Sequence, residues 1–369
     1  MTATATKPKA SSTTVTLPRT ELLDAVVQCK AAWQSRGPKP VLANVRIGDG
    51  LVTATDLELR IDVAIAEHCD PVLLPGERLL SILRAASGET VKLTRKETSV
   101  KVTCGGGSWT LPTEDVAEFP SWEPANLQPV CRLPADQFAR TAKATTYATD
   151  SESSRYALGA VLVEVLDGNP TWVATDGRRL AYVETETDQA VDDQQVLVPR
   201  RLMDIVASVS GADSVQFLSN GKEVVAEAGS VTVTGRIVEG RFPRWRDVVG
   251  DVQGEPSVLE VADLLPAVRA AAIVTSEQSK GVDLTWTSDT LVISGRSSEY
   301  GESTVKCPVV VAGSTSSTKL DPRYLADFLR TLPPDEEPNV DVYAADPASR
   351  VLLRCGPYTG VIMPLAQEG

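Results

Sequence analysis

Histidine is almost absent from this chain of 369 residues, which contains only His68. No Cys, Asp or Glu accompanies His68 at a zinc-ligand spacing, and Ser-His chemistry lacks a base elsewhere. The phosphate-binding patterns G-x-x-x-x-G-K-[ST] and G-x-G-x-x-G are also missing. The sequence therefore predicts that the protein is not an enzyme and uses neither a cofactor nor a metal. A hydrolase that uses paired carboxylates, such as Asp192-Asp193, stays open as an alternative.

Long apolar runs are missing too, and none approaches the roughly 20 residues of a membrane span, so no membrane partner is expected. The first residues, MTATATKPKASS, lack the apolar stretch of a secretory signal. Residues 1–12 are predicted to be a disordered N-terminal extension, because Thr, Ala and Ser bury little apolar surface. The six cysteines are scattered without a C-x-x-C pair, which favours reduced thiols and a cytoplasmic protein.

One pattern of strand, turn and helix is present three times. Its strand-and-turn segments, VTATDLELR, WVATDGRRL and LVISGRSSE, place three matched residues at a spacing of 120: Asp56, Asp176 and Arg296. Each segment is followed by an amphipathic stretch with an early proline, which predicts helix starts at Pro75, Pro199 and Pro322. An earlier helix opens each repeat, and alternating stretches, one with an Asn220-Gly221 turn, predict antiparallel strands.

The repeats predict an α+β fold in which each domain has two helices packed on antiparallel sheets. Stretches rich in Pro, Gln and Gly near residues 129 and 254 suggest the boundaries. We therefore expect three similar domains, at 13–129, 130–253 and 254–369. Three near-equal units favour an assembly with approximate rotational symmetry.

The chain has fewer basic than acidic residues: it contains 36 Lys and Arg and 49 Asp and Glu, which gives a net charge of −13. This balance argues against a protein that is basic all over and coats nucleic acid. The six predicted helical segments carry 13 basic and 11 acidic residues and are much less acidic than the rest: 17–36, 74–88, 133–150, 198–211, 259–281 and 320–332. A mildly basic helical surface would hold phosphates loosely without reading bases.

Taken together in order and spacing, several segments resemble one family, the bacterial DNA polymerase III beta subunit or sliding clamp. They are KPVLANVRI, TDLELRI, RYALGAVLVEV, VATDGRRLAYVE, VPRRLMDIV, IVEGRFPRWRDVV, RAAAIVTSEQSKGVDL and VIMPL. The resemblance covers residues 13–365 approximately. It implies three clamp domains that form half of a head-to-tail homodimeric ring, with helices lining a hole around double-stranded DNA.

The resemblance also implies the function, that of a processivity factor which encircles duplex DNA without sequence preference. Its expected partners are the alpha subunit of the replicative DNA polymerase, the clamp loader, and other DNA polymerases and repair proteins that carry clamp-binding peptides. A repeat-built scaffold that binds proteins but no DNA is the alternative function. Retention on closed circular DNA distinguishes the two.

Three groups of site residues follow from the resemblance. The partner-peptide pocket, which includes the C-terminal strand of the third domain, is expected at Leu158, Thr175, Gly177, Arg179, Leu180, Pro243, Val248, Val361, Met363, Pro364 and Leu365. The residues expected to face DNA are Arg36, Arg78, Arg84, Arg140, Lys143, Tyr156, Arg200, Arg201, Arg269 and Arg323, with Arg330 as a further candidate. The expected dimer interface comprises Trp109, Leu111, Ile273, Val274, Glu299 and Glu302.

Two positions depart from the family pattern at the pocket. Arg178 lies where relatives often have histidine, and Asp247 lies where they often have a basic residue. The sequence does not indicate a role for either residue, whereas Arg179 is expected to contact a partner peptide. Ala157 stands where relatives commonly have a second aromatic residue after Tyr156.

Overall fold

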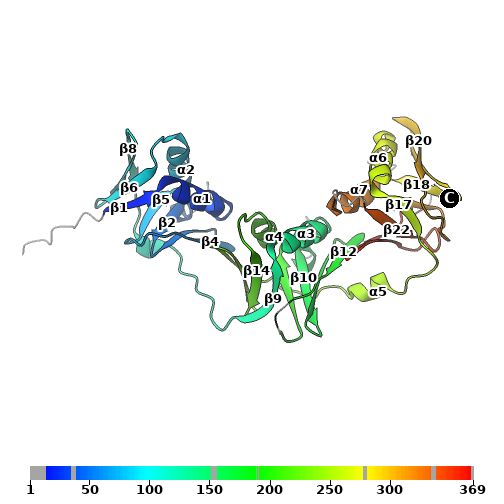
Figure 1. The fold of residues 1–369 in the computed structure, drawn as a ribbon, viewed down its shortest axis with the longest axis horizontal. Helices are drawn as coiled ribbons and strands as arrows, with labels where there is room; N and C mark the ends of the chain where they lie inside the picture. The colour runs from blue at the N-terminus through cyan, green and yellow to red at the C-terminus, as the bar shows by residue number, and fades with distance from the viewer. Residues whose placement is uncertain are drawn as a thin grey trace, which may run out of the picture. The chain divides into compact units, whose positions relative to one another are not determined.

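One order of elements, a strand, a helix and three strands, occurs six times along the described part of the chain, twice in each repeat (Figure 1). The computed structural model describes residues 14–34, 39–150, 156–187, 189, 191–276, 281–333 and 338–366. The predicted N-terminal extension, residues 1–12, lies outside these residues.

The elements follow the chain in three similar series. The first is β1 (Thr14–Pro18), α1 (Arg19–Cys29), η1 (Lys30–Ala32), η2 (Pro40–Ala43), β2 (Asn44–Gly48), β3 (Leu51–Thr55), β4 (Leu59–Ala64), β5 (Val72–Pro75), α2 (Gly76–Ala85), β6 (Thr90–Arg95), β7 (Ser99–Cys104), β8 (Gly107–Pro112) and η3 (Val116–Glu118). The second is β9 (Gln128–Pro134), α3 (Ala135–Thr146), η4 (Tyr156–Gly159), β10 (Ala160–Leu166), β11 (Asn169–Thr175), β12 (Arg179–Glu184), β13 (Gln194–Pro199), α4 (Arg200–Ala207), β14 (Ser214–Ser219), β15 (Glu223–Ala228), β16 (Val231–Arg236) and α5 (Trp245–Val249). The third is β17 (Ser257–Glu260), α6 (Val261–Ala271), η5 (Ala272–Val274), β18 (Val282–Trp286), β19 (Thr290–Ser297), β20 (Gly301–Pro308), β21 (Thr318–Leu320), α7 (Pro322–Thr331), β22 (Asn339–Tyr343), β23 (Val351–Cys355) and β24 (Tyr358–Ile362).

The helices begin later than the sequence predicts, because each is entered from a strand. Of the three expected helix starts, only Pro322 lies in the first turn, where Asp321 caps the helix by accepting from the Arg323 N–H. Pro75 and Pro199 end β5 and β13, and α2 and α4 begin one residue later. A proline suits both places, since its fixed φ fits an extended residue as well as a first helical turn.

The described chain divides into two compact units that do not follow the repeats. One contains the residues up to Pro129 together with Ser208–Arg236, and the other contains Val130–Ala207 and the residues from Ile237 onward. The last three strands of the second repeat fall in the first unit, because β16 pairs with β4 of the first repeat. On the basis of the repeats, we propose that the domains are residues 13–129, 130–253 and 254–369.

The two halves of each repeat exchange their first strands. In the first unit one sheet has the order β1-β6-β7-β8, and the other begins β5-β2-β3-β4 and continues through β16-β15-β14. In the second unit the orders are β21-β18-β19-β20 and β13-β10-β11-β12-β24-β23-β22-β17. The paired strands described within these sheets are antiparallel, which confirms the predicted α+β fold. The predicted hairpin with the Asn220-Gly221 turn joins β14 to β15.

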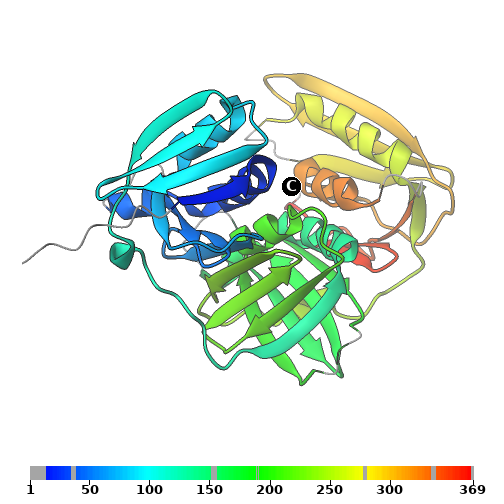
Figure 2. The ribbon, with the colours of Figure 1, turned by 60° about the vertical axis from the view of Figure 1, so that its left-hand side comes forward.

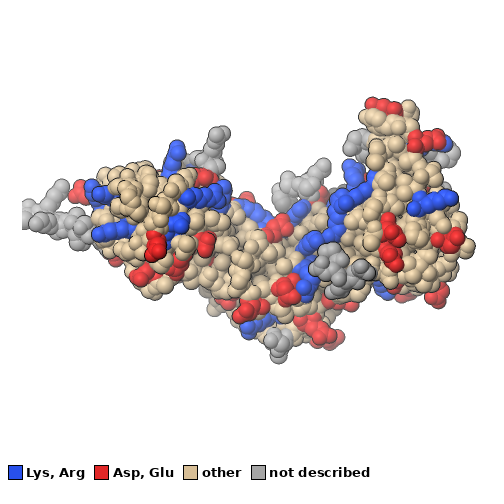
Figure 3. All heavy atoms as spheres, turned by 45° about the horizontal axis from the view of Figure 1, so that its top comes forward, with Lys and Arg blue, Asp and Glu red and all other residues tan. Residues whose placement is uncertain are grey.

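The helices pack in pairs within each unit, α1 with α2, α3 with α4, and α6 with α7 (Figures 1 and 2). In the second repeat, Phe138 of α3 lies edge-on to Trp172 of β11, with ring centroids 5.7 Å apart, and both side chains are fully buried. In the third repeat, Phe328 of α7 lies so close to β24 that a Cβ at Gly360 would come within 2.6 Å of its ring. On the face that Figure 3 shows, acidic and basic side chains are interspersed.

Candidate partner-binding site

The turn between β11 and β12 carries the two adjacent arginines of the sequence. The Asp176 carboxylate accepts the N–H groups of Arg178 and Arg179 at 2.9 and 3.0 Å. The Thr175 hydroxyl accepts the Gly177 N–H and donates to the Arg179 carbonyl. Gly177 has φ of 85°, a left-handed conformation that glycine adopts without steric cost. These contacts determine the turn locally, and the first repeat uses Thr55 and Asp56 in the same way.

The C-terminal strand lies directly beside this turn. β24 pairs with β12 in a register that sets Leu180 opposite Val361, and the Met363 N–H donates to the Arg178 carbonyl at 2.9 Å. Residues almost two hundred positions apart therefore form one surface. Leu180 and Val361 are buried and form its floor, whereas Met363 is 43% exposed.

The segment around α5 forms the opposite wall. Trp245 is buried against Tyr182, with ring centroids 5.1 Å apart, and its indole N–H donates to Glu164 at 3.3 Å. The same buried carboxylate accepts from Arg246 and from the Gln195 amide. A buried carboxylate with three donors is well satisfied, and it therefore holds the wall in a defined position.

Together these elements enclose a cavity of about 430 Å³, which we call the partner cavity. Its lining residues are Thr175, Gly177, Arg178, Arg179, Leu180, Pro243, Trp245, Asp247, Val248, Ala348, Ser349, Arg350, Val361 and Met363. Eight of the residues that the resemblance placed in a peptide pocket are among them. A second cavity, of about 670 Å³, lies along residues 237–247 and shares Pro243, Trp245 and Asp247 with the first.

Three of the expected pocket residues do not line the partner cavity. Leu158 is buried within η4, and the Leu365 N–H donates to the Lys319 carbonyl at the edge strand β21. Pro364 lies between Met363 and Leu365, at the point where the chain leaves the cavity. Sequence reasoning in turn missed Trp245, Ala348, Ser349 and Arg350. Only Trp245 had a visible signal, as the last residue of the RFPRW segment.

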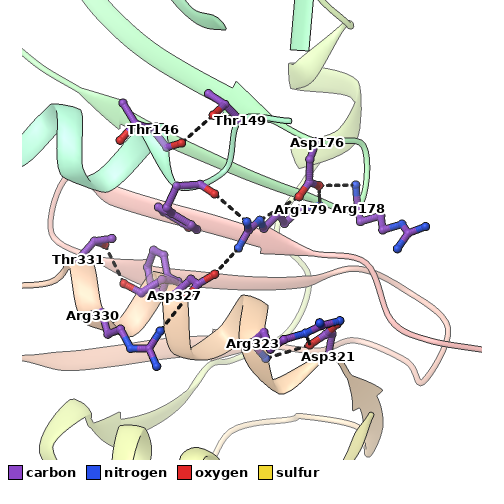
Figure 4. Close-up of polar contacts among 12 residues, drawn as sticks. Thr146, Thr149, Asp176, Arg178, Arg179, Asp321, Arg323, Asp327, Arg330 and Thr331 are labelled. Carbon is purple, nitrogen blue, oxygen red and sulfur yellow. Dashed lines mark hydrogen bonds and ion pairs between the residues drawn. The ribbon is translucent and has the colours of Figure 1, made fainter. Parts of the chain in front are cut away.

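Arg179, which lines the partner cavity, also has a set of contacts within the chain (Figure 4). The guanidinium donates to Asp176 at 3.0 Å, to Asp327 of α7 at 2.7 Å and to the Tyr147 carbonyl at 2.7 Å. It also lies over the rings of Tyr147 and Tyr324, at 5.2 and 4.6 Å from their centroids. Only 13% of the side chain is exposed, and most of its donors are therefore occupied by the protein.

The electrostatics of this cluster keep Arg179 charged. Burial works against the charge, but the hydrogen bond to Asp327 and the negative charge of Asp176 together raise the pKa of Arg179 above its usual value. Burial likewise raises the pKa of the Tyr147 hydroxyl. Arg179 thus ties the β11–β12 turn, the end of α3 and helix α7 into one arrangement.

The residues expected to face DNA lie exposed on the helices, with two exceptions. Arg36 is outside the described residues, and the Tyr156 side chain is outside the described part as well. The exposed residues are Arg78 and Arg84 on α2, Arg140 and Lys143 on α3, Arg200 and Arg201 on α4, Arg269 on α6, and Arg323 and Arg330 on α7.

Several of these cations are already paired with an acid of the same helix or of its cap. The pairs are Arg140 with Asp136, Arg200 with Asp204, Arg323 with Asp321, and Arg330 with Asp327, at 2.7 to 3.4 Å. In the part of the chain that the structure describes, no ion pair involves Arg78, Arg84, Lys143 or Arg269. The second group therefore offers the more available positive charge.

The residues expected at the dimer interface lie on the edge strand β8, in η5, and in or just before the edge strand β20. Trp109 is half-buried and Leu111 is buried on β8, the edge strand of the β1-β6-β7-β8 sheet. Ile273 is 78% exposed in η5, next to the half-buried Val274. Glu299 is exposed in the turn between β19 and β20, and Glu302 is exposed at the start of the edge strand β20, where it pairs with Arg296 at 2.9 Å.

Within the described residues, no group of three or more His, Cys, Asp or Glu side chains is placed to hold a metal ion. The helices of the described part are all too short or too polar to cross a membrane. The described cysteines are free, and burial raises the pKa of the Cys29 and Cys131 thiols.

Comparison with known proteins defines the class. Residues 13–123 match the N-terminal domain of the DNA polymerase III beta subunit, and residues 132–244 match its central domain. The chain belongs to the DNA polymerase III beta subunit family. Members of this family are beta sliding clamps, and the protein is accordingly a DNA sliding clamp, a processivity factor and not an enzyme.

The relatives extend over nearly the whole chain. The beta sliding clamp of Escherichia coli (strain K12) is 28% identical over 353 residues, which cover 92% of this chain and 94% of the relative. That of Pseudomonas putida is 26% identical over 351 residues, 92% and 95% of the two chains. The solved sliding clamp of Bacillus subtilis shares the fold, with a TM-score of 0.89 at 19% identity, and covers 97% of this chain and 100% of its own.

The cluster around Arg179 leads to a stability prediction. Arg179→Gln should lower the free energy of unfolding by roughly 2–3 kcal/mol, because Asp176 and Asp327 would no longer have a charged, largely buried hydrogen-bond partner. Urea unfolding followed by tryptophan fluorescence measures the change. The neighbouring substitution Arg178→Gln, at an exposed site, serves as the control and should stay within about 0.5 kcal/mol of the original protein. Equal destabilisation of the two variants would contradict the internal role of Arg179.

Proposed function

We propose that two copies of this chain close head to tail into a ring around duplex DNA and bind partner peptides in the partner cavity. The proposed partners are the alpha subunit of the replicative polymerase, the clamp loader, and other polymerases and repair proteins that carry clamp-binding peptides. The proposed location is the cytoplasm, in keeping with the reduced, scattered cysteines. The observation that carries the ring is the way in which the sheets join.

The two sheets that join one repeat to the next follow one rule: the last strand of a repeat pairs with the last strand in the first half of the preceding repeat. β16, the last strand of the second repeat, pairs with β4, which ends the first half of the first repeat. β24, the last strand of the third repeat, pairs in the same way with β12 of the second repeat. The strands that this rule leaves over are β8 at the end of the first repeat and β20 at the end of the first half of the third repeat.

A second copy satisfies both remaining edges. If β8 of one chain joins β20 of the other, the rule continues across the subunit boundary, and the contact is heterologous, as a closed ring requires. Exposed strand edges have unsatisfied backbone groups that favour such pairing. The exposed Ile273 and the half-buried Trp109 supply apolar surface near these edges. Such a joint depends on strand pairing and apolar burial together.

The helices supply a surface suited to weak DNA contact. Their exposed cations lie on several helices, and neighbouring acids on the same helices neutralise about half of them. Contacts of this kind with phosphates are screened, sequence-independent and easily exchanged. A ring with this lining holds DNA because it encircles it, while the contacts themselves permit movement along the duplex.

The ring hypothesis is tested by retention on DNA circles. Protein diluted to monomers and then concentrated with closed circular DNA should remain on the circles through gel filtration at high salt. Cutting each circle once should release it, because the free ends let a ring slide off. A scaffold that does not bind DNA would show no retention, and an adhesive DNA-binding protein would stay on the cut DNA; either result contradicts the proposal.

The subunit joint is tested by charge insertion. Ile273→Glu should convert dimers to monomers in sedimentation velocity, since a carboxylate at this exposed site would be buried without a partner. Trp109→Glu should do the same from the other side. Leu166→Glu is the control and should leave the dimer intact, because Leu166 ends β10 and is already 42% exposed. Unchanged sedimentation of the Ile273 variant would refute the joint.

The charge distribution predicts which cations matter for DNA. Replacing the unpaired set, Arg78, Arg84, Lys143 and Arg269, with Gln should flatten the salt dependence of binding to linear duplex, by up to about 0.9 in log-log slope for each phosphate that the protein no longer neutralises. Replacing the paired set, Arg140, Arg200, Arg323 and Arg330, should change the slope less. Anisotropy titrations over a range of salt concentrations measure both, and a larger effect of the paired set would contradict the assignment.

A further inference from the structure

The wall that α5 contributes to the partner cavity has little support of its own. The helix has only five residues, Trp245–Val249, and no side-chain hydrogen bond caps its start. Trp245 and Val249 are buried, whereas the three residues between them are exposed. Four residues of α5 and the stretch before it nevertheless line the cavity: Pro243, Trp245, Asp247 and Val248. The shape of the cavity therefore depends on what holds Trp245 in place.

One carboxylate, that of Glu164 on β10, holds Trp245 against the sheet. It accepts the indole N–H of Trp245 at 3.3 Å and forms an ion pair with Arg246. The Arg246 guanidinium in turn lies 4.2 Å from the centroid of the Trp245 ring. Glu164 is directly opposite Gln195 of β13, whose amide donates to it at 2.6 Å. Two neighbouring residues of α5 are thus held by a single side chain of the sheet.

Glu164 acts from outside the partner cavity. Neither Glu164 nor Arg246 belongs to the lining of that cavity, and both line the second cavity, which shares Trp245 with it. The Glu164 side chain is only 6% exposed, and a ligand in the partner cavity has no access to it. Any effect of Glu164 on such a ligand must therefore pass through Trp245 and Arg246.

The charge of Glu164 gives the contact its strength. Hydrogen bonds to a carboxylate are stronger than those to a neutral group, and without this charge Arg246 loses its counterion. Trp245 also belongs to the apolar cluster that includes the floor residues Leu180 and Val361. A movement of the indole ring would therefore disturb the wall and the floor together.

We propose that Glu164 is a positioning residue for partner binding, which holds the α5 wall through Trp245 and Arg246 and so sets the affinity of the partner cavity. The proposal rests on the peptide-binding function put forward above, but it does not depend on which peptide binds. When a wall is fixed before binding, the ligand does not lose free energy in ordering it. Without the Glu164 charge, part of the binding free energy would be used to order α5.

The first repeat provides a matched control. Its tryptophan, Trp122, also donates its indole N–H to a glutamate, Glu223 of β15, and the Arg236 guanidinium lies 6.0 Å from the centroid of its ring. The segments EFPSW and RFPRW correspond in the repeat, but Trp122 and Glu223 line neither of the two cavities. Removal of the Glu223 charge therefore tests the same kind of contact away from the partner cavity.

Fluorescence polarisation with the full-length protein measures the role of Glu164. The probe is a fluorescein-labelled nonapeptide with uncharged side chains that ends in an amidated Leu-Phe, so that a changed protein charge has little direct effect on it. Glu164→Gln should weaken binding about tenfold, the scale of one lost charge-assisted hydrogen bond. Arg246→Gln should weaken it about threefold, because the hydrogen bond between Trp245 and Glu164 remains. Glu223→Gln should change the affinity less than about twofold.

A spectroscopic signature separates positioning from a general loss of stability. In protein labelled with fluorotryptophan, the fluorine NMR resonance of Trp245 is assigned by its absence from Trp245→Phe. In Glu164→Gln this resonance should shift and broaden without the probe, and it should sharpen when the probe saturates the protein. The resonance of Trp122 should stay unchanged in Glu164→Gln and should move in Glu223→Gln instead.

The outcomes separate the two proposals. Unchanged affinity in both Glu164→Gln and Arg246→Gln overturns the positioning role, and so does an equal loss of affinity in Glu223→Gln. If Glu164→Gln does not fold, Arg246→Gln decides alone, because the Arg246 side chain is half exposed and its replacement leaves the apolar cluster in place. A probe that does not bind the original protein overturns the peptide-binding function itself.

Discussion

The pairing of β24 with β12 is the contact on which the partner cavity depends. It brings the C-terminal residues Val361 and Met363 beside Leu180 and the Arg178 carbonyl, and no local sequence could create that surface. Strand pairing alone fixes the position along the strands but leaves the turn free to bend. Arg179 removes this freedom, because its guanidinium joins the turn at Asp176 to helix α7 at Asp327. The floor of the cavity, which is built from two repeats, is therefore held in place by contacts within the chain. A ligand that bound there would not have to compensate for the entropic cost of ordering the floor.

The rim of the same cavity has the opposite character. Met363 and Val248 are about 40% exposed, and Arg178 and Arg350 carry donors that no carboxylate in the described chain accepts. Rigid apolar floors give affinity, whereas exposed and flexible rims allow different ligands to be accommodated. The two adjacent arginines of the turn therefore differ, because the Arg179 guanidinium makes contacts within the chain whereas Arg178 is exposed.

The sequence reveals those features that depend on local patterns. The repeats, the Asn220-Gly221 hairpin and the apolar residues Leu180 and Val361 follow from periodicity, turn chemistry and resemblance. The sequence predicts helix starts that are too early, because the apolar residues of an extended strand that leads into a helix resemble those of the helix itself. The partner of Arg179 could not be foreseen, since Asp327 lies 148 residues away. Likewise, the contact of Trp245 with Glu164, 81 residues apart, is visible only once the sheet is formed.

The charges on the helices follow a related principle. An evenly and strongly basic lining would hold each phosphate in a deep energy well, and movement along DNA would then require many strong contacts to break at once. In the ring proposed here, the pairing of Arg140, Arg200, Arg323 and Arg330 with nearby acids would make each contact with DNA weaker, because a phosphate would have to compete with a carboxylate for the same guanidinium. Exchange between two acceptors of the same sign costs little free energy. If these helices face DNA as proposed, their acidic residues would be part of what allows a closed ring to slide, and the topology of the ring instead of adhesion would hold it on DNA.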